Sequence, residues 1–184
     1  MKQCRYIILD RDGVINQDSD AFIKSVEEWQ PLPNSLEAIA LLKQHGYTVG
    51  IASNQSGIKR GLFDLATLNA MHDKMQRLLA KLGSHVDIIA FCPHGPDDNC
   101  DCRKPKPGLY QQLANHWDIS LDNIPVIGDS LRDLQAAMAV NAQPLLVRTG
   151  KGEKTLRELP QDWNIPVFDD LFHAVNQILM ETGS

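Results

Sequence analysis

The chain has 184 residues, of which 43% are apolar and 22% charged, and its net charge is −5. These values predict one globular domain over residues 1–184 with an apolar core. The acidic balance argues against a nucleic-acid-binding protein, which normally carries a basic face. The apolar run at residues 6–9 is too short for a signal-peptide core or a membrane span. We expect a cytoplasmic monomer without nucleic-acid or membrane partners.

Strand and helix patterns alternate along the chain. Short apolar runs predict buried strands at residues 6–9, 49–52, 86–91, 124–127 and 144–147. Apolar residues three and four positions apart predict helices that begin near residues 35, 65, 108, 131 and 171. This alternation is typical of an α/β fold with a doubly wound, mostly parallel sheet.

Polar residues of consistent chemistry follow the predicted strands. Asp10-x-Asp12 follows the first, Ser53 follows the second, Arg103-Lys104 comes after the loop that follows the third, and Asp129 follows the fourth. Ligands of such sheets bind outside the carboxyl ends of the strands, so these residues should meet at one edge. An Asp-x-Asp sequence alone is equally typical of a solvated strand end. The joint pattern is what indicates a site.

Phosphoryl transfer needs a nucleophile, a cation that screens it, and donors for the phosphoryl oxygens. The strand ends supply carboxylates, a hydroxyl and a fixed positive charge. Carboxylates would repel a phosphate dianion unless a cation lay between them, and Mg²⁺ prefers oxygen ligands. We therefore expect a Mg²⁺-dependent reaction with the side chains of Asp10 and Asp129 as metal ligands.

The segment Asp10–Val14, read DRDGV, resembles the first motif of the haloacid dehalogenase-type phosphatases. Ser53, Lys104 and Gly128-Asp129 fall where the second, third and fourth motifs of that family lie. The resemblance spans nearly the whole chain. It implies a phosphoric monoester hydrolase with the fold of that family.

The resemblance also implies a role for each motif residue. Asp10 would attack phosphorus and form an aspartyl-phosphate, and Asp12 would act as general acid and then as general base. The backbone carbonyl of Asp12 would be a further Mg²⁺ ligand. Ser53 and Lys104 would stabilise the phosphoryl group during transfer.

Three cysteines and one histidine lie within eleven positions: Cys92, His94, Cys100 and Cys102. Tetrahedral Zn²⁺ takes four nitrogen or sulfur ligands, and three cysteines with one histidine form a known structural set. The competing interpretations are a disulfide between Cys100 and Cys102, which a reducing compartment disfavours, and four unconnected residues. Four protein ligands leave no open position, so we expect a structural zinc that holds the loop before Arg103 and Lys104.

The zinc cluster followed by Arg-Lys-Pro is similar to one subgroup of the family. That subgroup contains the heptose-1,7-bisphosphate 7-phosphatases and the histidinol-phosphatase domains. The segments 53–57 and 148–150 are similar to the heptose enzymes. The resemblance therefore implies hydrolysis of the 7-phosphate of D-glycero-D-manno-heptose 1,7-bisphosphate, on the pathway to nucleotide-activated heptose and lipopolysaccharide core. Expected substrate contacts are Asp18, Asn54, Gln55, Ser56 and Arg103.

The intervals between the motifs are too short for a separate cap domain, so loops should cover the site. Two alternatives remain open from sequence. A histidinol phosphatase would bind an ammonium group, which Asp18 and Asp20 would suit. A non-catalytic, zinc-stabilised binding module would not need the acidic set.

Other polar residues have no single interpretation from sequence. Asp133 either supports the metal site or caps Ser130, and we favour the cap. The roles of Arg60, Lys106 and Arg148 stay open. The remaining histidines are expected to be structural or surface residues: His45, His72, His85, His116 and His173.

Overall fold

The computed structural model describes residues 5–182. Six strands form one sheet, all neighbours are parallel, and the order is β3-β2-β1-β4-β5-β6. The strands are β1 (Arg5–Leu9), β2 (Tyr47–Asn54), β3 (Ile88–Cys92), β4 (Pro125–Gly128), β5 (Gln143–Val147) and β6 (Val167–Phe168). The chain order reverses between β1 and β4. Ligands of doubly wound sheets bind at such a switch point.

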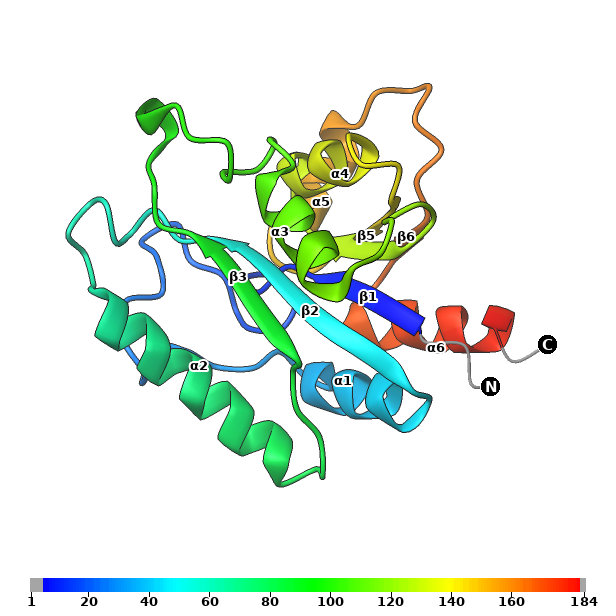
Figure 1. Ribbon diagram of the computed structural model, residues 1–184, viewed down its shortest axis with the longest axis horizontal. Helices are drawn as coiled ribbons and strands as arrows, with labels where there is room; N and C mark the ends of the chain where they lie inside the picture. The colour runs from blue at the N-terminus through cyan, green and yellow to red at the C-terminus, as the bar shows by residue number, and fades with distance from the viewer. Residues whose placement is uncertain (1–4, 183–184) are drawn as a thin grey trace.

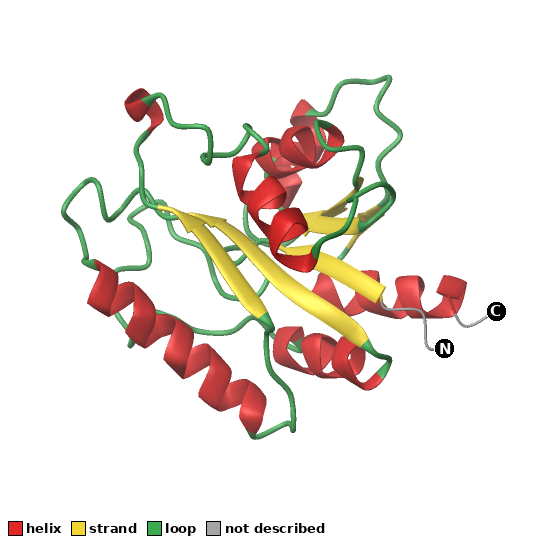
Figure 2. Cartoon of the chain, viewed as in Figure 1, coloured by secondary structure: helices red, strands yellow, loops and turns green. Residues whose placement is uncertain are grey.

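Helices cover both faces of the sheet, as Figures 1 and 2 show. They are α1 (Ser35–Gln44), α2 (Leu65–Ala80), α3 (Gly108–Trp117), α4 (Leu131–Met138), α5 (Gly152–Glu158) and α6 (Leu171–Thr182), with a short 3₁₀ turn, η1 (Pro96–Asp98). Helices α1, α2 and α6 lie on one face, and α3 and α4 on the other (Figure 1). None of the helices in the described part of the chain has the length and apolarity that crossing a bilayer requires.

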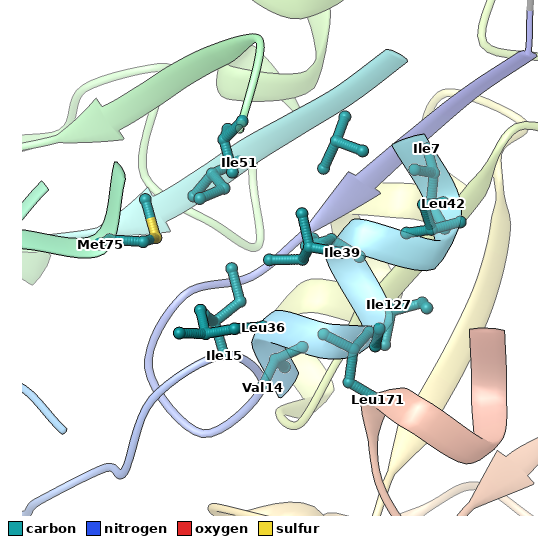
Figure 3. Packing of buried hydrophobic residues seen from close by; sticks show 14 of the residues in the cluster. Ile7, Val14, Ile15, Leu36, Ile39, Leu42, Ile51, Met75, Ile127 and Leu171 are labelled. Carbon is teal, nitrogen blue, oxygen red and sulfur yellow. The ribbon is translucent and has the colours of Figure 1, made fainter. Parts of the chain in front are cut away.

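The central strand β1 explains why the first apolar run is continuous. Its side chains alternate between two separate cores. Ile7 and Leu9 pack into the cluster beneath α1, α2 and α6, part of which Figure 3 shows, whereas Ile8 packs into the cluster beneath α3 and α4. All three side chains are fully buried. An apolar residue is therefore needed at each of positions 7–9, because neither face of this part of β1 meets water.

The predicted fold class is confirmed, with boundary shifts of up to two residues at most elements. The third strand occupies Ile88–Cys92 rather than residues 86–91, so Cys92 is its last residue. The elements β6 and α5 were not predicted. The strand β6 has only two residues, and α5 is a seven-residue helix that buries only Gly152 and Thr155. Neither carries the apolar periodicity on which the sequence prediction depends.

Three neighbouring strands, β1, β2 and β4, end at the same edge of the sheet. The chain from β1 to β2 adds only α1, and the chain from β2 to β3 adds only α2. In the described residues no further folded unit is therefore inserted over this edge. The edge is covered by the loops that follow the strands, including the loop from β3 through η1 to α3.

A buried polar contact connects α2 to the segment after β1. Arg11 is fully buried, and His72 of α2 is 8% exposed. The Nη1 of Arg11 lies 3.3 Å from the Nε2 of His72. Burial, followed by the nearby Arg11 charge, lowers the pKa of His72 to about 4. His72 is therefore neutral in the folded protein at neutral pH.

This buried histidine predicts a pH dependence of stability. The unfolded chain binds a proton at His72 near pH 6.5, but the folded chain binds it only near pH 4. The contribution of His72 to the free energy of unfolding is therefore highest above pH 6.5, where His72 is neutral in both states, and it decreases as the pH falls toward 4 because only the unfolded chain binds the proton. Between pH 7 and pH 5, wild type should lose about 2 kcal/mol more unfolding free energy than His72→Gln. Urea denaturation at both pH values measures this, and equal losses in the two proteins would contradict it.

Candidate active site

A cleft of about 350 Å³ opens at the carboxyl edge of the sheet. Nine of the predicted catalytic or substrate-binding residues line it: Asp10, Asp12, Asp18, Asn54, Gln55, Ser56, Arg103, Lys104 and Asp129. Ser53 differs, because it is fully buried near the end of β2 and does not line the cleft. The fold thus gathers residues from the ends of β1, β2 and β4 and from the loop that follows β3.

Lys104 is the centre of the charge network in this cleft. Its ammonium nitrogen lies 3.0 Å from a carboxylate oxygen of Asp10 and 2.6 Å from one of Asp133. It also donates to the backbone carbonyl of Ala52 at 2.7 Å. Burial alone would lower the pKa of Lys104, but the two carboxylates raise it well above its ordinary value. Lys104 therefore keeps its charge although it is almost inaccessible to water.

Asp133 is held by contacts within the protein. One of its oxygens pairs with Lys104. The other accepts hydrogen bonds from the backbone N–H groups of Asp129 and Ser130, at 3.2 and 3.0 Å, and from the Ser130 hydroxyl at 2.8 Å. The capping interaction expected from sequence is therefore present. The ion pair with Lys104 was not expected, because the two residues are distant in the chain.

The carboxylates of Asp10 and Asp129 lie close together, and the positive charge nearby is too small to neutralise both. Oxygens of Asp10, Asp129 and Asp133 all lie within 4.8 Å of one another. Burial and the negative charge of Asp133 raise the pKa of Asp10 to about 7, against the opposing effect of Lys104. Burial and the charge of Asp10 raise the pKa of Asp129 well above its ordinary value. A divalent cation would relieve this repulsion, so the residues present fit a Mg²⁺ site.

The carboxyl group of Asp129 sits in a cradle of backbone groups. The N–H of Lys151 donates to Asp129 Oδ2 at 2.8 Å, and the Thr155 hydroxyl donates to the Asp129 carbonyl at 2.8 Å. Gly13 and Gly150 both have a positive φ, and a Cβ on either would overlap the Asp129 carboxylate. Only glycine meets both requirements at these positions. The sequence signal for this cradle was therefore a pair of glycines far apart in the chain.

Asp12 has a full set of donors. Arg11 donates to Asp12 Oδ1 from Nε at 3.2 Å and from Nη2 at 2.8 Å, and its Nη2 also lies 3.1 Å from Oδ2. Asn16 donates to Oδ1 and Gln55 to Oδ2, both at 2.8 Å. Burial would raise the pKa of Asp12, but Arg11 and these hydrogen bonds lower it overall. The donor set therefore fixes the orientation of this carboxylate.

Two of the predicted substrate contacts have side chains that bond to the protein. The amide of Asn54 donates to the Lys104 carbonyl at 3.1 Å and accepts from the Lys104 N–H at 3.0 Å. The amide of Gln55 donates to the Ser53 hydroxyl at 2.7 Å in addition to Asp12. Asn54 thus holds the backbone of Lys104 in place, and Gln55 connects Ser53 to Asp12. Sequence spacing could not show these pairings.

The predicted zinc ligands lie together in the loop after β3. The sulfur of Cys102 lies 2.8 Å from that of Cys92 and 3.6 Å from that of Cys100, and the His94 Nδ1 lies 3.3 Å from the Cys102 sulfur. Ligand atoms around one tetrahedral Zn²⁺ are about 3.5–3.8 Å apart. The Cys92 sulfur lies 3.6 Å from both the His94 Nδ1 and the Cys100 sulfur, which matches, so the four residues fit such an ion once the sulfurs of Cys92 and Cys102 move apart by about 1 Å. No disulfide joins Cys92, Cys100 and Cys102.

Three arginines gather on the side of the cleft toward the zinc loop. Arg103, Arg132 and Arg60 all line the cleft. Burial and the neighbouring Arg132 lower the pKa of Arg103, with a smaller effect from Arg60. Among the described residues, none of the three forms an ion pair with a carboxylate. Arg132 was missed from sequence, because its position in α4 looks like an ordinary surface position.

The predicted substrate contact Asp18 and two cations left open from sequence differ in their position. Asp18 lines the cleft and pairs with Lys151 at 3.4 Å. Arg148 pairs with Glu153 at 2.9 Å outside the cleft. Lys106 is exposed, lies 3.6 Å from Asp101, and also does not line the cleft. Arg148 and Lys106 are therefore surface cations in this structure.

Known proteins are similar to this chain over nearly its whole length. The family profile described as polynucleotide kinase 3 phosphatase matches residues 7–137, and the one described as HAD-hydrolase-like, where HAD stands for haloacid dehalogenase, matches residues 101–174. The D-glycero-β-D-manno-heptose-1,7-bisphosphate 7-phosphatase of Bordetella bronchiseptica is 56% identical over 177 residues, which cover 96% of this chain and 99% of that protein. The enzyme of the same name from Pseudomonas aeruginosa is 54% identical over 174 residues, 94% of this chain and 97% of that protein.

Solved structures agree with the sequence comparison. The crystal structure of the D,D-heptose 1,7-bisphosphate phosphatase from B. bronchiseptica, complexed with magnesium and phosphate, superposes with a TM-score of 0.94. The superposition covers 96% of this chain and 99% of that chain, at 56% identity. The enzyme from Burkholderia thailandensis is 44% identical with a TM-score of 0.76, over 95% of this chain and 98% of that chain. The chain therefore belongs to the heptose-1,7-bisphosphate 7-phosphatase family of haloacid dehalogenase-type hydrolases.

Proposed function

We propose that this chain is a Mg²⁺-dependent phosphatase that hydrolyses the 7-phosphate of D-glycero-β-D-manno-heptose 1,7-bisphosphate. The observation that carries the proposal is the combination of two features. The chain is 56% identical to an enzyme of that name over 96% of its length. The acidic residues and Lys104, which the chemistry requires, meet in one cleft.

Asp10 is the proposed nucleophile, with its attack on phosphorus giving an aspartyl-phosphate. The ammonium nitrogen of Lys104 lies 3.0 Å from a carboxylate oxygen of Asp10. The positive charge of Lys104 is therefore close enough to stabilise the phosphoryl oxygens during transfer. Ser53 is fully buried outside the cleft lining and its hydroxyl accepts from Gln55, so in this structure it is connected to the cleft only through Gln55. Asp12 gives a proton to the leaving alcohol and then takes one from the attacking water.

The metal site we propose consists of the side chains of Asp10 and Asp129 and the backbone carbonyl of Asp12. Mg²⁺ would neutralise the carboxylates that face the phosphate and so remove the repulsion between them. Asp133 is a weaker candidate for a ligand, because its oxygens already accept from Lys104, Ser130 and the Asp129 N–H.

The three arginines are the proposed subsite for the second phosphate of the substrate. Guanidinium groups that crowd one another without a carboxylate partner would gain stability from a bound dianion. Arg103 and Arg132 also line a second hollow beside Gly95, Pro96 and Cys100 of the zinc loop. This position beside the zinc loop suits the second phosphate of the substrate.

The alternatives receive less support from the site. A histidinol phosphatase would need a carboxylate for an ammonium group. Asp18 is paired with Lys151 but Asp20 also lines the cleft, so the 56% identity to a heptose enzyme is what disfavours this alternative. A non-catalytic module would not require the acidic residues and Lys104 to meet. We further propose that the protein is a cytoplasmic monomer. We also propose that it has a single domain, which the single sheet supports, and that it does not act on nucleic acid, which the net charge of −5 supports.

The nucleophile can be tested directly. Asp10→Asn should reduce phosphate release from the heptose bisphosphate by at least about 10⁴-fold, because an amide does not attack phosphorus. Wild type should lose its activity in excess EDTA and regain it with Mg²⁺. Asp87→Asn is the matched control. Asp87 is a partly exposed carboxylate that directly precedes β3, at the opposite edge of the sheet from the cleft. Activity in Asp10→Asn near that of the control would disprove the proposed role.

The second-phosphate subsite can be tested with a pair of substrates. Arg132→Ala should lower kcat/KM for the bisphosphate about tenfold or more, since a charged hydrogen bond to phosphate is lost. The same change should have little effect on heptose 7-phosphate, which lacks the second phosphate. Arg148→Ala is the control, because Arg148 lies outside the cleft. Equal losses on both substrates would show that Arg132 does not bind the second phosphate.

The zinc loop can be tested by metal analysis. The purified protein should contain about one zinc per chain, and removing it should lower activity before or together with thermal stability. Cys100→Ser should have the same effect. His85→Ala, which changes an exposed histidine outside the cluster, should leave the zinc content unchanged. A fully active protein without zinc would rule out this site.

A further inference from the structure

We infer that His72 is a positioning residue for the reaction: it holds the guanidinium of Arg11, which in turn orients the carboxyl group of Asp12 toward the leaving oxygen. This inference rests on the proposed function, because it assumes that Asp12 is the general acid. His72 itself lines no part of the cleft. It acts only through Arg11.

The geometry forms a chain of three side chains. Arg11 is fully buried between its two partners. One edge of its guanidinium, Nε and Nη2, faces Asp12, and the remaining nitrogen, Nη1, lies 3.3 Å from His72 Nε2. Among the described residues, His72 is the only side chain that forms a hydrogen bond or ion pair with Nη1. Without His72, the guanidinium would be fixed from one side only.

The chemistry of the contact sets the tautomer of His72. Arginine donates hydrogen bonds and accepts none, so Nε2 of His72 must be the acceptor. The imidazole is then neutral and carries its proton on Nδ1. The depressed pKa of His72, to about 4, agrees with this state. A protonated histidine here would face the Arg11 charge directly, so the contact also favours the neutral form.

The contact matters because the two oxygens of Asp12 are not equivalent. Oδ1 accepts from Arg11 Nε and Nη2 and from Asn16, whereas Oδ2 accepts from Gln55 and, at 3.1 Å, from Arg11 Nη2. Oδ2 is therefore the better position for the proton. As the bond from phosphorus to the leaving oxygen breaks, that oxygen takes the proton from Oδ2. When water attacks the aspartyl-phosphate, Asp12 takes a proton back, and the cycle balances.

The leaving group gives a readout that a purely structural role would not change. A sugar alkoxide is a poor leaving group and needs a proton, whereas p-nitrophenolate leaves without one. His72→Leu removes the acceptor, and His72→Gln keeps one at the end of a side chain of similar length. His116→Leu is the matched control, because His116 is exposed on α3. All four proteins are assayed as Mg²⁺- and zinc-loaded enzymes on the heptose bisphosphate and on p-nitrophenyl phosphate.

We expect His72→Leu to lower kcat on the heptose bisphosphate about tenfold, with KM nearly unchanged. In this variant the first-turnover burst of p-nitrophenolate from p-nitrophenyl phosphate, which reports formation of the aspartyl-phosphate before Asp12 acts as base, should stay within about twofold of wild type in rate. His72→Gln should recover most of the lost rate, and His116→Leu should match wild type. An equal loss in the heptose rate and in this burst, no loss in either, or no recovery in His72→Gln would overturn the inference.

A second measurement tests the contact without activity. Nitrogen chemical shifts of His72 in ¹⁵N-histidine-labelled protein should show an unprotonated Nε2 from pH 8 to below pH 6. A His72 that titrates near pH 6.5, or that carries its proton on Nε2, would overturn the inference even if the kinetics agreed. If wild type does not hydrolyse the bisphosphate, the proposed function fails. The inference then stands or falls on these shifts and on any aliphatic phosphate ester that wild type does hydrolyse.

Discussion

The buried ion pairs of Lys104 with Asp10 and Asp133 determine how the rest of the site is arranged. A buried ammonium group is tolerable only if opposite charges and hydrogen-bond acceptors surround it, and here two carboxylates and the Ala52 carbonyl do so. The pairs join the end of β1 to the start of α4 through a residue of the loop after β3. The ammonium group of Lys104 thereby connects three segments that are distant in the sequence.

The same ion pairs leave negative charge in the cleft that Lys104 does not neutralise. Lys104 compensates Asp133 well, but Asp10 and Asp129 retain raised pKa values because one ammonium group cannot balance every carboxylate nearby. The acidic side therefore favours a cation, and the arginine side favours an anion. The loop after β3 connects the two, since Arg103 and Lys104 directly follow Cys102, the last residue of the Cys/His cluster. A zinc ion bound to that cluster would hold this loop, and with it the charge of Lys104, without a cap domain.

Much of the fold and of the candidate site could be predicted from sequence, because the sequence patterns that indicate them are local. The apolar runs and helical periodicities each lie within a few residues, and the fold class that their alternation predicted is confirmed. The spacing of Cys92, His94, Cys100 and Cys102 is equally local, and the four residues do lie together. The missed features depend on tertiary contacts. Nothing near Arg132 in the sequence shows that α4 places it beside Arg103, and nothing joins Arg11 to His72, 61 positions later, until α2 packs on the sheet. Asn54 and Gln55 line the cleft as expected, but the bonds of their amides to protein groups could not be predicted from sequence.

The central claim is that Asp10 and Asp129 share a divalent cation while Asp133 stays with Lys104. Anomalous diffraction from crystals grown with Mn²⁺ in place of Mg²⁺ tests it most directly. The account predicts one peak in the cleft in contact with Asp10 and Asp129, with the ion pair between Lys104 and Asp133 intact. A peak coordinated by Asp133 with Lys104 displaced, or no peak in the cleft at a Mn²⁺ concentration that supports activity, would contradict it.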